Sequence, residues 1–93
     1  MPTLFELIKD AVRNERYLVS WHADERFEDR GVSEWQVIAG IDDAELLRER
    51  PASKPNPSVV LRQVLADGQT VEVVWSWLDE TARAKLVTVY FTD

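Results

Sequence analysis

The sequence predicts an α+β domain with two to three N-terminal helices packed on a three- to four-stranded antiparallel sheet. In residues 3–41, apolar side chains recur at helical spacing. Residues 59–92 contain three strand-like segments, and in the middle one, residues 70–78, apolar side chains alternate between the two faces as they do along a β-strand. Because the helical pattern comes first and the strand pattern follows without a linker, the two are expected to form one domain spanning residues 1–93.

The first helix is expected to begin after Thr3 and to end near Glu15. Thr3 and Glu6 match a capping box, in which the threonine hydroxyl accepts from the backbone three residues on and the glutamate reaches back. Residues 17–19 follow as a short extended link.

A second helix is expected between Ser20 and Gly31. Serine is a favourable N-cap, and glycine suits the left-handed residue that ends many helices. Ser33 and Gln36 match another capping box, which predicts a third helix through about Ile41.

The second half of the chain predicts the sheet. Residues 45–48 are expected to form a short strand, and residues 51–57, which contain three prolines, a loop. Asp67 and Gly68 predict a hairpin turn. The main strands are expected at Val59–Leu65, Thr70–Leu78 and Lys85–Thr92, with a polar loop at 79–84 before the last.

Four tryptophans are many for a chain of 93 residues. Trp75 and Trp77 share one face of a predicted strand, which favours core packing against the helices, the alternative being an aromatic platform for a base or a partner. Trp21 points away from the apolar stripe of its helix, and Trp35 begins the third helix. Exposure of either side chain would favour a protein contact.

Composition limits the classes of function. The chain has no cysteine, which excludes disulfides and thiolate chemistry, and no apolar run long enough to cross a membrane. The N-terminal segment does not resemble a signal peptide, so a cytoplasmic location is expected. The net charge of −6 would repel nucleic acids and anionic membranes, so any binding of a polyanion must depend on a local basic cluster.

One such cluster is the basic column, formed by His22, Arg26 and Arg30. A helical wheel places these side chains on one flank of the second helix, beside the apolar Ala23 and Phe27 and at the edge where a cleft would lie. On this helix, three pairs of side chains four residues apart carry like charges, and each such pair lowers helix stability by about 0.2–0.5 kcal/mol. Two explanations remain open: the arginines brace the helix against the loop and sheet, or they face a bound anion such as RNA phosphate. The like-charged pairs are Arg26–Arg30, Asp24–Glu28 and Glu25–Asp29.

The stretch Ser20-x-His22-Ala23-x-x-Arg26-x-x-x-Arg30-Gly31-Val32-Ser33 resembles the signature of a bacterial family, domain-of-unknown-function family 4258 (DUF4258). Its members typically show a strand ending in Ser-x-His, a helix with two arginines, a Gly-Ile/Val-Ser turn, a second helix and a sheet. The family is thought to be related to RelE- and BrnT-type toxins, so the resemblance implies a RelE-like α+β fold.

The resemblance also implies a metal-independent endoribonuclease of a toxin–antitoxin system. Such an enzyme turns the 2′-hydroxyl of RNA onto the adjacent phosphate, which requires a base, an acid and cations. His22 would be base or acid, and Arg26 and Arg30 would bind phosphate. Further donors could come from the sheet, from Ser76, Thr88 or Tyr90.

Neither a metal nor another cofactor is expected, because no second histidine or cysteine completes a site with His22 and Glu25. The expected partners are RNA or the ribosome, together with a cognate antitoxin or another protein. An exposed sheet edge could also support a homodimer.

Acidity and the surplus of tryptophan favour a different class of function. RelE-type toxins are usually basic, and a single histidine excludes a paired-histidine mechanism. The alternative is therefore a non-catalytic protein-interaction or regulatory module derived from the same fold.

Overall fold

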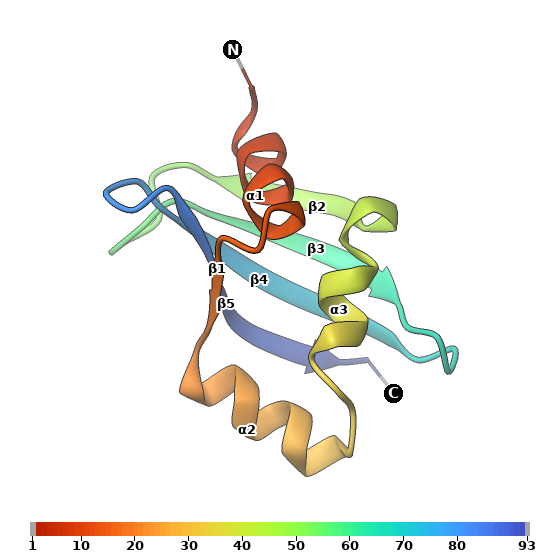
Figure 1. The fold of residues 1–93 in the computed structure, drawn as a ribbon. Coiled ribbons are helices and arrows are strands. Elements are labelled where there is room, and N and C mark those ends of the chain that lie inside the picture. The colour runs from red at the N-terminus through yellow and green to blue at the C-terminus, as the bar shows by residue number, and fades with distance from the viewer. Residues whose placement is uncertain (1, 93) are drawn as a thin grey trace.

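The structure of the chain, a computed structural model, describes residues 2–92. Three helices and a short strand come first, and four longer strands follow (Figure 1). The elements are α1 (Leu4–Arg13), β1 (Tyr17–Val19), α2 (Trp21–Arg30), α3 (Trp35–Ala39), the 3-10 turn η1 (Ile41–Asp43), β2 (Glu45–Arg50), β3 (Ser58–Val64), β4 (Thr70–Leu78) and β5 (Arg83–Phe91). The predicted α+β class is confirmed.

The sheet has five strands in the order β1-β5-β4-β3-β2. β1 pairs with β5 in parallel and the other neighbours are antiparallel, so the sheet is mixed. The prediction of three to four antiparallel strands was wrong in this respect. Residues 17–19, predicted to be a link, pair with residues 84–86. A strand of three residues has too few side chains to show a period, and its partner is distant in the sequence.

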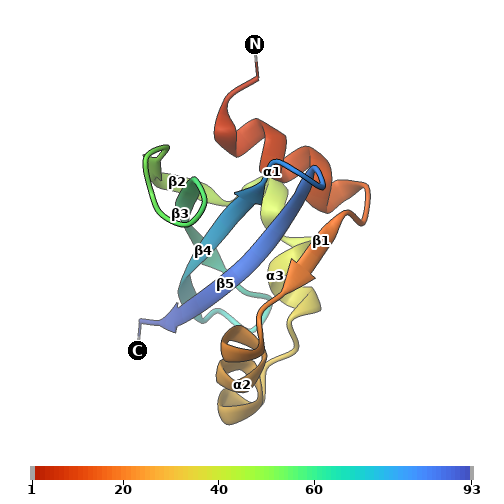
Figure 2. The same ribbon diagram turned by 90° about the vertical axis from the view of Figure 1, so that its left-hand side faces the viewer.

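α1 and α3 lie over one face of the sheet, and α2 lies beyond its β5 edge (Figure 1). In the side view, the β2–β3 loop stands out on the side of the sheet away from α1 and α3 (Figure 2). We call that side the uncovered face, since no helix between residues 2 and 92 lies over it. None of those helices is long and apolar enough to cross a membrane.

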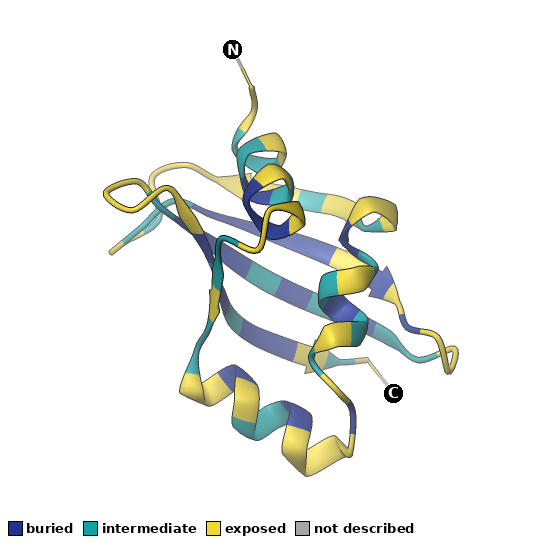
Figure 3. Ribbon diagram, viewed as in Figure 1, coloured by how far each residue is buried: buried dark blue, intermediate teal, exposed yellow. Residues whose placement is uncertain are grey.

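The core lies between the sheet and these helices (Figure 3). Val71, Val73, Trp75 and Trp77 alternate toward it along β4, and all are buried. The core position predicted for the two tryptophans is therefore confirmed. The Tyr17 ring meets Trp75 edge-on, with 6.5 Å between ring centroids, and this contact joins β1 to the core.

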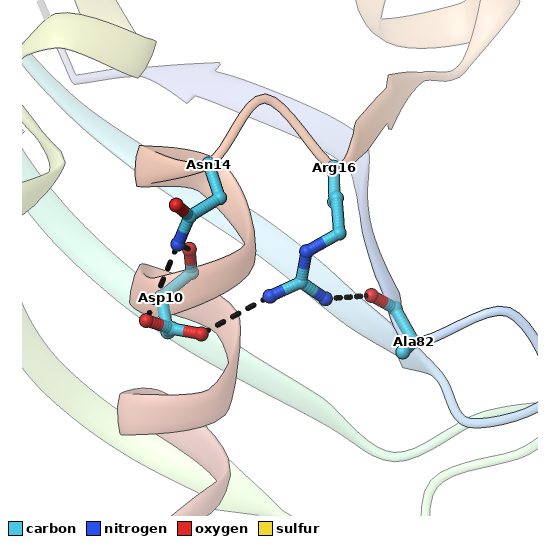
Figure 4. A network of polar contacts seen from close by, with 4 residues as sticks. All are labelled: Asp10, Asn14, Arg16 and Ala82. Atoms are coloured by element: carbon cyan, nitrogen blue, oxygen red, sulfur yellow. Dashed lines mark hydrogen bonds and ion pairs between the residues drawn. The ribbon is translucent and has the colours of Figure 1, made fainter.

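The first helix begins at the predicted capping box, in which Thr3 and Glu6 bond each other reciprocally. It ends at Arg13, two residues before the predicted end, and the chain then turns into β1. Figure 4 shows the contacts at this turn: Asp10 accepts from Asn14 and Arg16, and Arg16 also donates to the Ala82 carbonyl. These contacts join the end of α1 to the β4–β5 turn.

Local signals also predicted α2 correctly. The Ser20 hydroxyl accepts from the Ala23 N–H at 3.0 Å, and Gly31 ends the helix with φ +64°. The capping box predicted at Ser33 and Gln36 was wrong. The N-cap of α3 is Glu34, whose backbone is helical, with φ −60° and ψ −28°, and whose side chain makes no capping hydrogen bond. A serine that caps a helix needs an extended backbone at the N-cap position.

Boundaries elsewhere differ by a few residues. α3 ends at Ala39, and the chain continues as η1 rather than as one helix through Ile41. β2 extends to Arg50, two residues beyond its predicted end. The predicted loop at 51–57 joins β2 to β3 as expected.

Candidate functional site

The basic column of His22, Arg26 and Arg30 lies on the flank of α2 that is turned away from α3. Ala23 and Phe27 of the same helix are buried in the core. The opposite flank, with Asp24 and Glu28, lines a hollow together with Glu34, next to α3. The basic column is therefore on the flank of α2 opposite the hollow beside α3.

Both arginines of the column contact β5. The Arg26 Nε donates to the Val89 carbonyl at 3.4 Å, and the Arg30 guanidinium lies 4.6 Å from the centroid of the Phe91 ring. These contacts brace α2 against the edge of the sheet and give the like-charged pair partners outside its own helix. His22 is exposed, and no hydrogen bond or ion pair joins its side chain to another residue of the described chain.

Among the described residues, a pocket lies along the acidic flank of α2, where Asp24 and Glu28 line it. Burial beside Asp24 raises the pKa of Glu34 there: loss of solvent contributes most, followed by the charge and hydrogen bonding of the Asp24 carboxylate. This flank would repel an anion at neutral pH.

The uncovered face gathers residues from strands far apart in the sequence. Strand register places Arg50, Ser58, Ser76 and Lys85 side by side across β2, β3, β4 and β5. The next row contains Arg48, Val60, Val74 and Thr88, and the row after it Glu45, Arg62, Glu72 and Tyr90. The three donors expected from the sheet, Ser76, Thr88 and Tyr90, all belong to these rows.

The first of these rows lines a pocket beneath the β2–β3 loop. Its volume is about 210 Å³, and it opens on the uncovered face. The cationic side chains around it are Arg50, Lys54 and Lys85, and the hydroxyls are those of Ser53, Ser58 and Ser76. No aspartate or glutamate is among the lining residues. We call this the basic pocket.

Sequence reasoning missed the basic pocket. Arg48 and Arg50 are two residues apart on a strand, which places them on one face, and this was the one local signal. Lys85 lies far along the chain and reaches the pocket only through strand pairing. Within residues 2–92, no three His, Asp or Glu side chains gather in a group that could hold a metal ion.

Fold and site together define a small α+β domain with a helix-free, basic sheet face and a basic column on the adjacent helix. The chain belongs to the DUF4258 family. The family model, described as a domain of unknown function, matches residues 19–91, which include the last residue of β1, the helices α2 and α3, and strands β2 to β5. No curated protein and no solved structure matches the chain.

Proposed function

We propose that the chain is a toxin-like, RNA-directed domain related to the RelE- and BrnT-type toxins, and that RNA binds along the uncovered face beside α2. The observation that carries the proposal is the distribution of charge. The molecule is acidic overall, with a net charge of −6, yet on the strands of the uncovered face the cations outnumber the acids. The cations are Arg48, Arg50, Arg62, Arg83 and Lys85, and the acids are Glu45 and Glu72.

The basic column extends this surface along α2. Arg26 reaches β5 at Val89, four residues beyond Lys85, which corresponds to about 13 Å along a strand. A chain of phosphates lying across β5 could therefore meet cations from both the helix and the sheet. Because phosphate contacts supply most of the affinity in non-specific nucleic-acid binding, such a local surface can offset an unfavourable overall charge.

The proposed chemistry is metal-independent cleavage by the 2′-hydroxyl of the RNA. His22 is exposed and could donate or accept a proton at a bound phosphate. The Arg26 Nε is engaged by the Val89 carbonyl, and no hydrogen bond within the described chain involves its two Nη groups. Those groups could stabilise the charge of the phosphorane, with Arg30 as the second cation.

Induction in a bacterial host tests this proposal. We expect wild-type protein to arrest growth and to cleave RNA, including ribosome-bound message that a test with free RNA would miss. His22→Ala and Arg26→Ala should relieve both effects. Arg26→Lys keeps the charge but loses the planar guanidinium group, so it should retain little of the wild-type activity if that group binds phosphate.

Arg13→Ala is the matched control, because it removes the same charge from α1, where Arg13 pairs with the exposed Asp42. It should remain toxic. Each variant must also show the wild-type thermal unfolding transition, since loss of the Arg26 brace could itself unfold the chain. Normal growth and intact RNA at high soluble wild-type expression would contradict the nuclease proposal.

Two exposed tryptophans support a second candidate, a non-catalytic protein-interaction module. Trp21 is 79% exposed and Trp35 is 63% exposed. Tryptophan is enriched among the residues that dominate binding energy at protein interfaces. If the wild-type protein leaves growth and RNA unchanged, an antitoxin-like or regulatory protein that covers these side chains becomes the better assignment.

A further inference from the structure

The basic pocket has the composition of a site for a compact anion. Two serines, Ser58 and Ser76, form the middle of the residue row that lines it, and Arg50 and Lys85 form the two ends. Lys54 enters from the β2–β3 loop. No ion pair within the described chain neutralises any of these three cations. The protein has a net charge of −6, so the charge of a pocket lined by three cations and no acid is opposite in sign to that of the molecule as a whole.

A simpler explanation covers part of this arrangement. Charged side chains on an edge strand discourage pairing with other chains, and β2 is an edge strand. That explanation does not extend to Lys85, which pairs with Leu18 on one side and with Ser76 on the other, so its strand is internal at that point. Edge protection also does not require the serine hydroxyls between the cations.

The β2–β3 loop gives the pocket a constrained wall. Three prolines, Pro51, Pro55 and Pro57, restrict the backbone of this loop. A backbone hydrogen bond holds each end of the loop, one to β2 and one to β4. Ser53 N–H donates to the Arg50 carbonyl at 3.1 Å, and Trp77 N–H donates to the Pro57 carbonyl at 2.9 Å. A wall held in this way loses little conformational entropy when a ligand binds.

We propose that the basic pocket binds a phosphate group, of the kind carried by a phosphate monoester such as a nucleotide. Arginine can engage phosphate oxygens with two parallel bonds, lysines add point charges, and serine hydroxyls donate to the remaining oxygens. The volume of about 210 Å³ is below that of ordinary small-molecule sites, which suits a phosphate group with the rest of the ligand outside. The pocket shares Arg50 and Lys85 with the proposed RNA surface but contains no residue of the basic column, so phosphate binding can be measured without RNA cleavage and the two proposals can fail separately.

The test is a titration of the ¹⁵N-labelled full chain, followed by amide chemical shifts at constant ionic strength. The probes are inorganic phosphate, adenosine 5′-monophosphate and adenosine. We expect phosphate and the monophosphate to give saturable shifts at Ser53, Ser58, Ser76 and Lys85, and adenosine to give none. Tighter binding of the monophosphate than of phosphate would assign a nucleotide source, and equal binding would assign free phosphate.

Lys85→Gln should weaken binding about tenfold, the loss typical of one charge-assisted contact. Lys9→Gln is the matched control: it removes the same charge from α1, where Lys9 lies over the Phe5 ring, and should leave the affinity unchanged. Ser76→Ala keeps the charge and should still weaken binding several-fold, because a hydroxyl donor is lost.

Shifts spread over all basic residues, equal effects of the two lysine substitutions, or full affinity in Ser76→Ala would each overturn the proposal. Adenosine binding as tightly as its monophosphate would also overturn it. Phosphate binding at this pocket in a protein that neither binds nor cleaves RNA would confirm the pocket and contradict only the RNA function.

Discussion

At the scale of single residues, the two arginines of α2 show how an unfavourable local pattern can be stable. Arg26 and Arg30 repel each other along the helix, yet each contacts β5, one through a backbone carbonyl and one through an aromatic ring. The helix therefore depends on the sheet for the partners that its own sequence does not supply.

Glu34 provides a prediction at this scale. Because its pKa is raised in the folded chain, the folded state binds more protons than the unfolded state, and the free energy of unfolding falls as pH rises through the ordinary value of 4.5 to the raised value. Glu34→Gln, which imitates the protonated form, should be more stable than wild type at pH 7. The advantage should disappear below about pH 4.

Urea denaturation at several pH values measures this difference. Glu6→Gln is the control of opposite sign, because the hydrogen bonds from Thr3 lower the pKa of Glu6. Its carboxylate contributes stability that is present above the ordinary pKa and lost as pH falls through the lowered one. A stability gain of Glu34→Gln that persists at pH 3 would rule out the titration of Glu34 as its cause.

At the scale of elements, α2 is connected to the sheet more firmly than its short apolar stripe suggests. Ser20 caps the helix and its hydroxyl also donates to the Val87 carbonyl at 2.6 Å. Its backbone N–H donates to the Leu86 carbonyl, where the pairing of β1 with β5 ends. One residue therefore ends a strand, begins a helix and sets the position of the basic column beside β5.

Ser20→Ala should destabilise the chain by about 1–2 kcal/mol, since it loses a helix cap and a hydrogen bond to β5. Thr3→Ala loses only the cap of α1 and should cost about 1 kcal/mol or less. Chemical denaturation of both variants under the same conditions measures the difference. An equal cost would mean that the bond from Ser20 to Val87 contributes nothing to stability.

At the scale of the whole molecule, one core joins every layer. Leu86 is fully buried in it, paired with Val19 on one side and with Trp75 on the other. The sheet therefore brings the N-terminal strand into contact with the middle of the C-terminal hairpin. A domain of this size has a stability of only about 5–15 kcal/mol, so a cavity at such a position removes a large share of it.

Leu86→Ala should cost about 2–5 kcal/mol, through lost burial and the cavity that remains. Val64→Ala, at a side chain that is 71% exposed, should change stability by about 0.5 kcal/mol or less. Both should unfold in one transition in urea if the chain is a single cooperative unit. Two separate transitions, or a small cost for Leu86→Ala, would contradict a shared core.

Local features of the sequence determined much of this protein. The caps at Thr3, Ser20 and Gly31 predicted two helices, and the alternation along residues 70–78 predicted the central strand and its buried tryptophans. These signals are reliable because they depend on bonds and side-chain directions within a few residues. Spacing along α2 likewise predicted that the basic column shares one flank, although its role in catalysis stays a prediction.

Tertiary structure alone decided the rest. Three features join segments that are distant in the chain. They are the parallel pairing of residues 17–19, the contacts of Arg26 and Arg30 with β5, and the convergence of Arg50, Lys54 and Lys85. Such contacts depend on strand order and register, which are selected by burial of the whole core rather than by any short pattern. For this reason the basic column was visible in the sequence and the basic pocket was not.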